Sequence, residues 1–534
     1  MPIRVAIRAD AAAEIGTGHV RRCLALAQGL REAGAEVWLV CRPLDAASLA
    51  VVQGSDTPVL WLPAAPGSAP LDASDLPPHA AWARIAQEED AAQVAALLRP
   101  LGVQWVCVDH YAFDARWHAA MRAALGCRIA VIDDLADRAI DAEVLLDQNW
   151  AEDHARKYAG RLVRGTGTRI LAGPRHALLA PAYRTAASYV FHPQVRSIGV
   201  FMGGTDPGGA SARVLAACAQ AGFDGAVEVV STSSNPHLVA LRQACAQRRR
   251  TTLTLDAPDL AAFLVRHDLQ VGGGGGATWE RCCLGAPSIA VMLADNQRSV
   301  VPALERMGVL EQARLDAPTS DPQSLPAVLL ALLHDSQRRR QLAEAGPALV
   351  DGRGAQRVAV CLLAQSASVR GATMDDAPLL HAWRNHPDVR RVSHDPSQIP
   401  LAAHLRWMES VLADPARLLL VAHIGSLPVG CVRFDQRNDV IAGLTRNPRG
   451  DETNHEVSIY LDPALHHLGL GQPVLRAAEQ ALAARHEGPL TVHASVLPDN
   501  AASRRLFEGA GYEGGPLSFT RRLPARSPGQ NGAP

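Results

Sequence analysis

The chain has 534 residues, of which 48% are hydrophobic and 20% charged, and its formal net charge is −1 at pH 7. At roughly 150 residues per domain this length predicts three or four domains, and the balanced charge does not favour nucleic acid or an anionic membrane as a partner. Lys157 is the one lysine among 52 basic residues. P-loop enzymes, protein kinases and pyridoxal phosphate enzymes each need a lysine in a characteristic motif, and the surroundings of Lys157 match none of them. These three classes are therefore excluded.

The cysteines and the N-terminus indicate the compartment. The ten cysteines include no Cys-x-x-Cys pair and lie mostly in apolar runs, so we expect small core residues in a reducing environment. The chain begins with a strand-like run, and no apolar segment reaches about 18 residues. The sequence thus predicts a cytoplasmic protein with neither a signal peptide nor a membrane span.

The first third alternates strand and helix patterns. Residues 3–9 are strand-like, a glycine-containing loop follows over 10–18, and apolar residues recur at helical spacing over 19–33. Gly34 stands where helices commonly end, and a strand pattern resumes at 36–41, which completes a βαβ unit. Further buried strands are predicted at 103–109, 128–132 and 143–147.

A second series of the same kind starts near residue 196. It predicts a helix from about 210 and strands at 197–202, 226–231, 252–255, 269–271 and 288–293. Alternating strands and helices imply parallel sheets covered on both faces. We therefore expect an α/β fold with two doubly wound lobes, at 1–185 and 186–365, and a site in the cleft between them.

The pattern changes after a short linker predicted at 366–371. The region 372–523 is expected to be a further α/β domain, with a disordered tail at 524–534. Its predicted helices are 375–386, 400–413, 472–486 and 500–510, and its predicted strands are 417–424, 427–434, 455–461 and 490–496. The polar stretch 436–454 is predicted to be a mobile insertion.

The first glycine-rich loop, Gly16-Thr17-Gly18-His19, lies between a predicted strand and helix. Its glycines let backbone approach a ligand, and the helix N-terminus offers free N–H groups to an anion. Arg21 occupies the position of the third glycine of a dinucleotide fingerprint, so that function is disfavoured. The positive helix end should keep His19 neutral and able to accept a proton, although a helix cap is the alternative interpretation.

The second glycine-rich loop is Gly272–Gly276, which follows a strand and opens a helix. It is a candidate cradle for a diphosphate. Glu280, one turn into the helix, is a candidate acceptor for ribose hydroxyls. Asp295-Asn296-Gln297 places polar groups at the carboxyl end of a strand, where ligand sites of α/β proteins form.

Several motifs in residues 1–360 resemble the UDP-sugar hydrolases of pseudaminic acid biosynthesis, which act on UDP-2,4-diacetamido-2,4,6-trideoxy-β-L-altropyranose. The matching motifs are Arg8-Ala9-Asp10, Ile15-Gly16-Thr17-Gly18-His19-Val20, Arg22-Cys23-Leu24, Asp109-His110-Tyr111, Ile132-Asp133-Asp134, Leu146-Asp147-Gln148-Asn149, Gly203-Gly204-Thr205-Asp206 and Asn296-Gln297. Ala12 stands where the family has serine.

This resemblance implies a fold like that of MurG-type GT-B glycosyltransferases and a reaction without metal. It implies that His19 activates water for attack at the anomeric carbon, with Tyr111 and Asn296 as neighbouring catalytic or sugar-positioning groups. It also implies a nucleotide near Thr278 and Glu280. The other substrate-binding residues that it implies are Asp10, Gly16, Gly18, Arg22, Gly203, Gly204 and Gln297.

The last third resembles GNAT acetyltransferases. Residues 466–471, His-His-Leu-Gly-Leu-Gly, resemble the acetyl-CoA loop, with His466 in place of the usual arginine or glutamine. A second motif, Asn500-x-x-Ser503-x-x-Leu506-Phe507, has the GNAT spacing. The resemblance implies acetyl-CoA as cosubstrate, and the residues implied to bind it are Leu461, His466, Gly469, Gly471, Asn500 and Ser503.

Two positions bear on acetyl transfer itself. Phe507 stands where many GNAT enzymes have the tyrosine that protonates the leaving thiolate, and phenylalanine cannot do so. Tyr512, a water molecule or another group would then act, or the thiolate would leave unaided. Glu456 is a candidate base for the acceptor amine, the alternative being an exposed residue at a strand start.

Trp383-Arg384-Asn385 and His404-x-x-Trp407 resemble the nucleotide-sugar N-acetyltransferase of the same pathway. They could bind uracil or phosphate, or simply pack between helices. We therefore expect a bifunctional enzyme that acetylates a UDP-4-amino sugar and then releases UDP from it. The alternatives are a GT-B glycosyltransferase, a hydrolase with a non-catalytic GNAT module, and a protein N-acetyltransferase.

Overall fold

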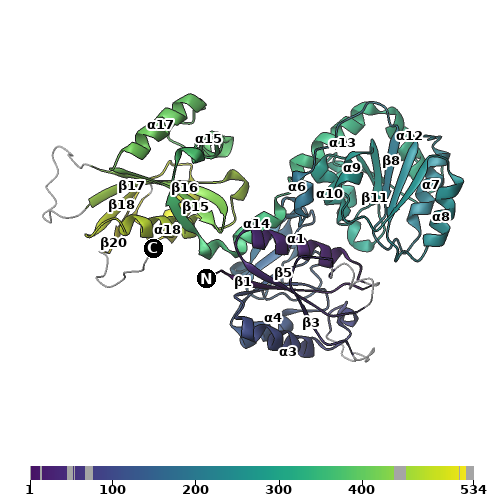
Figure 1. Cartoon of the computed structure of the whole chain (residues 1–534), viewed down its shortest axis with the longest axis horizontal. Coiled ribbons are helices and arrows are strands. Elements are labelled where there is room, and N and C mark those ends of the chain that lie inside the picture. The colour runs from purple at the N-terminus through teal and green to yellow at the C-terminus, as the bar shows by residue number, and fades with distance from the viewer. Residues whose placement is uncertain are drawn as a thin grey trace. The chain divides into compact units, whose positions relative to one another are not determined.

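The computed structural model describes residues 2–12, 15–44, 52, 54–65, 76–437, 453–515 and 517–524. The chain forms two compact units, one of residues 1–31 and 35–359 and the other of residues 32–34 and 360–534. The first unit holds two sheets and the second holds one (Figure 1). Among the helices of these described residues, none is long and apolar enough to cross a membrane.

The N-terminal lobe is built on a seven-stranded parallel sheet of order β3-β2-β1-β4-β5-β6-β7. Its strands are β1 (Arg4–Ala9), β2 (Glu36–Cys41), β3 (Val59–Trp61), β4 (Trp105–Asp109), β5 (Arg128–Ile132), β6 (Val144–Asp147) and β7 (Arg169–Ala172). Its helices are α1 (Gly18–Glu32), α3 (Gln87–Leu98), α4 (Ala115–Leu125) and α5 (His154–Lys157). The strand order reverses between β1 and β4, so the loops that follow these two strands lie side by side.

The second lobe has a six-stranded parallel sheet of order β10-β9-β8-β11-β12-β13. Its strands are β8 (Ser197–Phe201), β9 (Ala226–Ser231), β10 (Thr251–Leu255), β11 (Leu269–Gly273), β12 (Ser288–Val291) and β13 (Glu311–Ala313). The helices of this part are α6 (Pro181–Thr185), α7 (Ala210–Gln220), α8 (Leu238–Gln247), α9 (Ala261–Val265), α10 (Ala277–Leu284), α11 (Val301–Arg306), α12 (Leu325–His334), α13 (Ser336–Leu349) and α14 (Gly354–Leu362).

Apolar clusters cover both faces of this second sheet. Helices α7, α8 and α12 pack on one face, and α9 and α10 pack on the other (Figure 1). The strand order reverses between β8 and β11, which places the loop after β8 beside the glycine run that ends β11. Both lobes are therefore Rossmann-like, as the alternating pattern predicts.

The second unit holds a seven-stranded, mainly antiparallel sheet of order β14-β15-β16-β17-β18-β20-β19, in which β17 and β18 are parallel. Its strands are β14 (Ser368–Gly371), β15 (Arg417–Ile424), β16 (Leu427–Gln436), β17 (Thr453–Leu461), β18 (Leu490–Ser495), β19 (Glu513–Gly514) and β20 (Ser518–Leu523). Its helices are α15 (Ala377–Asn385), α16 (Pro387–Arg391), α17 (Leu401–Ala413), α18 (Gly471–Ala483) and α19 (Ala501–Gly509).

One sequence prediction is corrected here. Residues 368–371, predicted as part of a linker, form β14 and pair with β15. Their mostly exposed side chains lack a core pattern because the strand lies at the sheet edge, where backbone pairing supplies the stabilisation. Most of the predicted mobile insertion, 438–452, and the predicted tail from 525 onward lie outside the described residues.

His118 illustrates the cost of a polar group in the first core. Its side chain is fully buried on α4, and Nδ1 accepts a hydrogen bond from the backbone N–H of Asp141 at 3.3 Å. Burial, and then the positive charge of Arg138, lowers the pKa of His118 to about 3. An unfolded histidine titrates near pH 6.5, at about its ordinary pKa. The stability that neutral His118 allows is therefore present above pH 6.5 and is lost as the pH falls toward 3.

We predict that His118→Gln weakens the pH dependence of unfolding. In the wild type, His118 alone lowers the free energy of unfolding by up to about 1.4 kcal/mol per pH unit below pH 6.5, whereas glutamine does not titrate. Urea unfolding of the full chain at several pH values between 7 and about 5 measures the slope. His334→Gln, at an exposed histidine, is the matched control. Equal slopes in wild type and His118→Gln would contradict this account.

Candidate active site

A histidine, a carboxylate and an arginine meet at the strand-order reversal of the N-terminal lobe. His19 lies at the start of α1, and Asp109 is the last residue of β4. The Nδ1 atom of His19 lies 2.6 Å from Oδ1 of Asp109. Arg22, one turn further along α1, donates from Nε and Nη2 to the two oxygens of the same carboxylate, each at 2.6 Å.

The charges of this group fix which ring nitrogen can act. Burial alone would raise the pKa of Asp109, but Arg22 and His19 hold it well below its usual range. The carboxylate can therefore only accept, so Nδ1 of His19 donates to it. In the neutral ring this leaves the lone pair on Nε2, which is the arrangement of a general base oriented by a carboxylate. The side chain of His19 keeps 11% of its surface exposed.

The loop before His19 is open to a ligand. Gly16 has φ +76°, and a Cβ added at Gly16 or Gly18 would meet no atom within 4 Å. The glycines thus leave room beside the N-terminus of α1, as the sequence predicts.

Tyr111 forms the neighbouring wall. Its ring meets that of His19 edge to face, with centroids 4.7 Å apart. Its hydroxyl donates to Oδ1 of Asp134 in the loop after β5. Burial, and then the negative charge of Asp134, raises the pKa of Tyr111 well above its usual value, so the phenol stays protonated.

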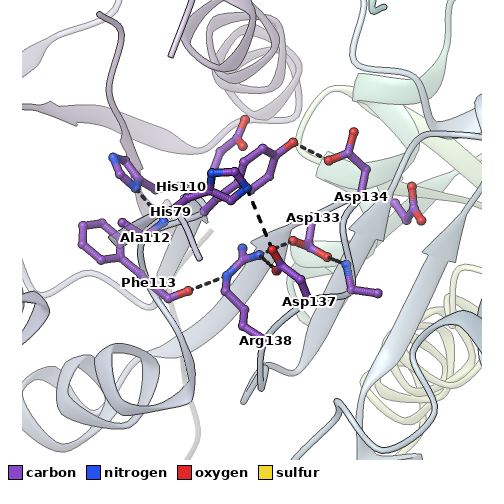
Figure 2. A network of polar contacts seen from close by, with 12 residues as sticks. His79, His110, Ala112, Phe113, Asp133, Asp134, Asp137 and Arg138 are labelled. Atoms are coloured by element: carbon purple, nitrogen blue, oxygen red, sulfur yellow. Dashed lines mark hydrogen bonds and ion pairs between the residues drawn. The ribbon is translucent and has the colours of Figure 1, made fainter. Parts of the chain in front are cut away.

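An ionic network supports this wall (Figure 2). Arg138 donates to the backbone carbonyl of Phe113 at 2.8 Å and to Oδ1 of Asp133 at 2.6 Å. It also contacts Asp137, whose carboxylate lies 4.0 Å from Nε2 of His79. Arg138 thereby ties the loop after β4 to the loop after β5 (Figure 2).

Asp10 is a correction, because the structure does not place it where a substrate could reach. Its side chain is fully buried, and Oδ1 accepts from Arg8 at 2.5 Å and from the backbone N–H of Arg42 at 2.7 Å. Burial would raise the pKa of Asp10, but Arg8 and His110 hold it far below its usual range. Asp10 therefore anchors the loop after β1 instead of binding a ligand.

The glycine run of the second lobe has two different parts. A Cβ at Gly272 would lie 2.3 Å from Nη1 of Arg281, and one at Gly274 would lie 2.4 Å from a methyl carbon of Val301, so packing alone requires these glycines. Gly275 and Gly276 are exposed, and Gly276 has open space around it. The part that can accept a diphosphate is thus the end next to α10.

Thr278 is corrected as a ligand contact. It is 1% exposed, and its hydroxyl accepts from Nη2 of Arg281 at 3.0 Å. Glu280 has the opposite character, because its buried Oε2 has no hydrogen-bond partner in the described part of the chain. Burial raises the pKa of Glu280 despite a hydrogen bond from Tyr183. An unpaired carboxylate oxygen of this kind suits a ligand hydroxyl.

The remaining predicted residues of this lobe lie in loops. Gln297 accepts from the backbone N–H of Leu293 at 2.8 Å, and its Nε2 lies 3.6 Å from the position of a Cβ on Gly275. Asn296 is exposed, and its contact with a ligand stays a prediction. Gly203, with φ +96°, and Gly204 form the loop after β8, and the carbonyl of Gly204 accepts from Thr232 at 2.6 Å.

The third sheet opens where a cofactor is expected. The strands β17 and β18 pair from Thr453 to Glu456, and in the described sheet residues 457–461 pair with β16 alone. This leaves a backbone edge, ending at Leu461, that can bind an extended amide-containing chain. Glu456 lies at the point of separation, where Oε1 accepts from Ser495 at 2.8 Å and Oε2 lies 3.6 Å from Arg437.

The predicted acetyl-CoA loop leads from this edge into α18. Its backbone turns through His467 at φ +69° and Gly469 at φ +79°, and Gly471 begins the helix. His466 is half-buried, and burial lowers its pKa. In the second motif, the side chain of Asn500 caps α19 by accepting from the backbone N–H of Ser503 at 3.0 Å. Contact of Asn500 and Ser503 with the cofactor stays a prediction.

Phe507 and Tyr512 belong to the core of this domain. Phe507 is 3% exposed and packs against Tyr512, with ring centroids 5.0 Å apart. The hydroxyl of Tyr512 donates to the buried carboxylate of Glu479 at 2.7 Å. Burial, and then the charge of Glu479, raises the pKa of Tyr512 far above its usual value. The hydroxyl hydrogen of Tyr512 is therefore bonded to Glu479 in this structure.

Two residues of the Trp383-Arg384-Asn385 motif are corrected. Trp383 is 6% exposed within an apolar cluster, because it lies on the inner face of α15. The side-chain amide of Asn385 bonds to both backbone groups of Ile399, each at 2.8 Å, and so fixes the loop before α17. Arg384 keeps a buried Nη1 without a partner among the described residues and stays a candidate contact.

The structure thus brings together His19, Arg22 and Tyr111 in one lobe, and Gly275 and Gln297 in the other. Asp109 and Asp134 are the members of the site that motif reading did not assign a function. The signal that could have found Asp109 is its position, a carboxylate at the last residue of a strand beside the predicted reversal of strand order.

Comparison with known proteins supports part of this assignment. The Acetyltransferase (GNAT) domain family matches residues 368–513. The spore coat polysaccharide biosynthesis protein SpsG of Bacillus subtilis is 27% identical over 198 residues, which are 36% of this chain and 58% of that protein. The chain therefore spans less than two thirds of the length of this relative.

The chain is also similar to several solved structures, among them the following three. MurG from Acinetobacter baumannii is 16% identical, covers 67% of this chain and 98% of its own, and has a TM-score of 0.44. A putative UDP-N-acetylglucosamine 2-epimerase from Listeria monocytogenes is 15% identical, with coverages of 68% and 96% and a TM-score of 0.46. The aminoglycoside acetyltransferase AAC(6')-Ib with coenzyme A is 19% identical, with coverages of 29% and 94% and a TM-score of 0.26.

The class follows from the sheets and the family match together. The chain carries two Rossmann-like lobes followed by a domain that matches the Acetyltransferase (GNAT) domain family, which confirms the expected α/β fold class.

We predict that Tyr512→Phe leaves acetyl transfer within about twofold of wild type while it lowers thermal stability by about 1–2 kcal/mol, since a buried carboxylate loses one donor. A continuous assay of free CoA thiol with the full chain measures the first effect, and a melting curve measures the second. Phe507→Leu is the matched control for core packing. A hundredfold loss of kcat in Tyr512→Phe would identify this tyrosine as the proton donor.

Proposed function

We propose that the chain is a bifunctional enzyme of nucleotide-sugar metabolism. The GNAT domain transfers an acetyl group from acetyl-CoA to the 4-amino group of a UDP-linked amino sugar. The two Rossmann-like lobes then hydrolyse the acetylated UDP-2,4-diacetamido-2,4,6-trideoxy-β-L-altropyranose to the free sugar and UDP, in the cytoplasm and without metal. The observation that carries the proposal is the His19–Asp109 pair beside the open Gly16–Gly18 loop.

The geometry accounts for hydrolysis as follows. Nε2 of His19 takes a proton from water as the water oxygen bonds to the anomeric carbon. The bond from that carbon to the diphosphate oxygen breaks, and UDP leaves with the electron pair. Asp109 stabilises the imidazolium that forms, and Arg22 keeps the carboxylate charged. The backbone N–H groups near Gly276 hold the diphosphate, and Glu280 accepts from the nucleoside.

Acetyl transfer uses the opening between β17 and β18. The amine nitrogen of the sugar bonds to the thioester carbon of acetyl-CoA, and the bond from that carbon to sulfur breaks, so that CoA leaves as the thiolate. Glu456 takes the proton of the acceptor amine, while Ser495 and Arg437 hold its carboxylate in place. The loop at Gly469 and Gly471 supplies backbone N–H groups for the pyrophosphate. With Phe507 apolar and Tyr512 bonded to Glu479, the leaving thiolate takes its proton from water.

One rival has a specific observation in its favour. Phe507 is buried and apolar, and the hydroxyl of Tyr512 is bonded to Glu479, so neither residue supplies the proton donor that GNAT enzymes usually have. This suits a GNAT module that binds a ligand without catalysing acetyl transfer. Incubation of the full chain with acetyl-CoA and the UDP-4-amino sugar distinguishes the two, since free CoA thiol forms only if the domain is catalytic. Release of UDP and free sugar without any added acceptor likewise excludes a glycosyltransferase.

We predict that His19→Gln lowers UDP release by roughly 100- to 10,000-fold while acetyl transfer stays at the wild-type rate, because the substitution removes the base from one unit alone. Asp109→Asn is expected to lower UDP release similarly, since an amide does not fix the ring or balance the imidazolium. Mass spectrometry of both products from one incubation measures the two activities together. Retention of most hydrolysis in His19→Gln would exclude it as the base.

A further inference from the structure

The hydroxyl hydrogen of Tyr111 is already used in a hydrogen bond to Asp134. Because the carboxylate of Asp134 can only accept, the phenol must donate to it. Tyr111 therefore offers only oxygen lone pairs toward the space beside His19. It can accept from an O–H or N–H group of a bound sugar, and it cannot act as a proton donor while Asp134 holds it.

Asp134 is itself oriented by the next side chain. Its Oδ2 accepts from Nδ2 of Asn149 at 2.6 Å, and Lys157 donates to its backbone carbonyl at 2.7 Å. Lys157 also donates to the carboxylate of Asp147 at 2.6 Å. Asp134, in the loop after β5, is thus held through its backbone by Lys157 and through its side chain by Asn149. The hydrogen bond from Asn149 sets the orientation of the Asp134 carboxylate.

Asn149 receives a hydrogen bond from the other lobe. Its Oδ1 lies 3.2 Å from Nε1 of Trp279. An indole N–H only donates and a carboxylate only accepts, so the amide of Asn149 has a single orientation that satisfies both neighbours. Each bond of the series then fixes the direction of the next one.

Trp279 lies in the first turn of α10, directly after the glycine run proposed to hold the diphosphate. It is 1% exposed and packs in an apolar cluster that also includes Trp150 from the segment after β6. The indole is therefore held rigidly, and its N–H is the fixed end of the series.

We propose that Asp134, Asn149 and Trp279 are positioning residues for Tyr111. They form a hydrogen-bonded series that holds the phenol as an acceptor beside His19. The fixed end of the series is Trp279, on α10 of the second lobe. The consequence for hydrolysis rests on the proposed function, whereas the series itself does not. The substrate group that Tyr111 selects is a hydrogen-bond donor, such as a sugar hydroxyl or an acetamido N–H.

The test is ¹⁹F NMR of the full chain labelled with 3-fluorotyrosine, which is tractable because the sequence has 6 tyrosines. Tyr111→Phe assigns the resonance of Tyr111. Trp279→Phe removes the N–H and keeps a large aromatic ring. We expect it to shift the Tyr111 resonance without any ligand present. Trp150→Phe, in the same apolar cluster, is the matched control and should leave the resonance in place.

Kinetics of UDP release supply the second measurement. We expect Trp279→Phe and Asn149→Ala each to lower kcat about 10- to 100-fold, as for a misplaced positioning group. In the double variant, the fold loss of kcat should be smaller than the product of the two single losses, because both substitutions break the same series. An unchanged Tyr111 resonance in Trp279→Phe overturns the proposal, and so does a shifted resonance with unchanged kcat. If the resonance shifts but wild type releases no UDP, the series stands and the proposed function fails.

Discussion

The buried carboxylate of Asp109 is the group on which the N-terminal site depends. A fully buried charge is costly unless it is paired and hydrogen-bonded. Arg22 supplies the opposite charge through two donors, and this leaves the carboxylate free to hold His19 as well. The three groups are therefore interdependent: Arg22 balances the buried charge of Asp109, and that carboxylate fixes the orientation of the His19 ring.

Sheet topology brings these groups together. His19 and Asp109 are 90 residues apart in the chain, and they meet because β1 and β4 are neighbours at the reversal of strand order. The second lobe repeats the arrangement, with the loops after β8 and β11 at its own reversal. Both glycine-rich loops of the first unit thus occupy the one place in a parallel sheet where adjacent loops diverge and leave room for a ligand.

The sequence predicts the central elements well because their patterns are strong. The βαβ unit at the N-terminus, the strand before the glycine run and the α17 helix all follow from apolar periodicity. The edge strands β3, β7 and β13 were not predicted, because short strands with one free edge need little apolar pattern. The strand β14 was read as a linker for the same reason.

Site residues were harder to predict where burial decides their function. The motifs predict His19 and Glu456 as bases, which stays a prediction, and they also assign binding to Asp10, Thr278 and Trp383, whose side chains are buried. A sequence pattern identifies a residue near a site without showing which way it points. The hydrogen-bond partners of Tyr111 could not be predicted from the sequence either, since Asp134 and Asn149 meet it and each other only through contacts between distant segments.

Lys157 gives the composition of the chain a structural meaning. Its compact ammonium bonds at once to the carbonyl of Asp134, in the loop after β5, and to the carboxylate of Asp147, the last residue of β6. A guanidinium is planar and longer, and it presents its donors in a fixed fork, so arginine would not bond to the same two oxygens without moving Asp134 and Asp147 apart. All the other residues among the 52 lysines and arginines of this protein are arginines. The one position at which the chain departs from that bias is thus a place where the size and shape of the cation matter as much as its charge.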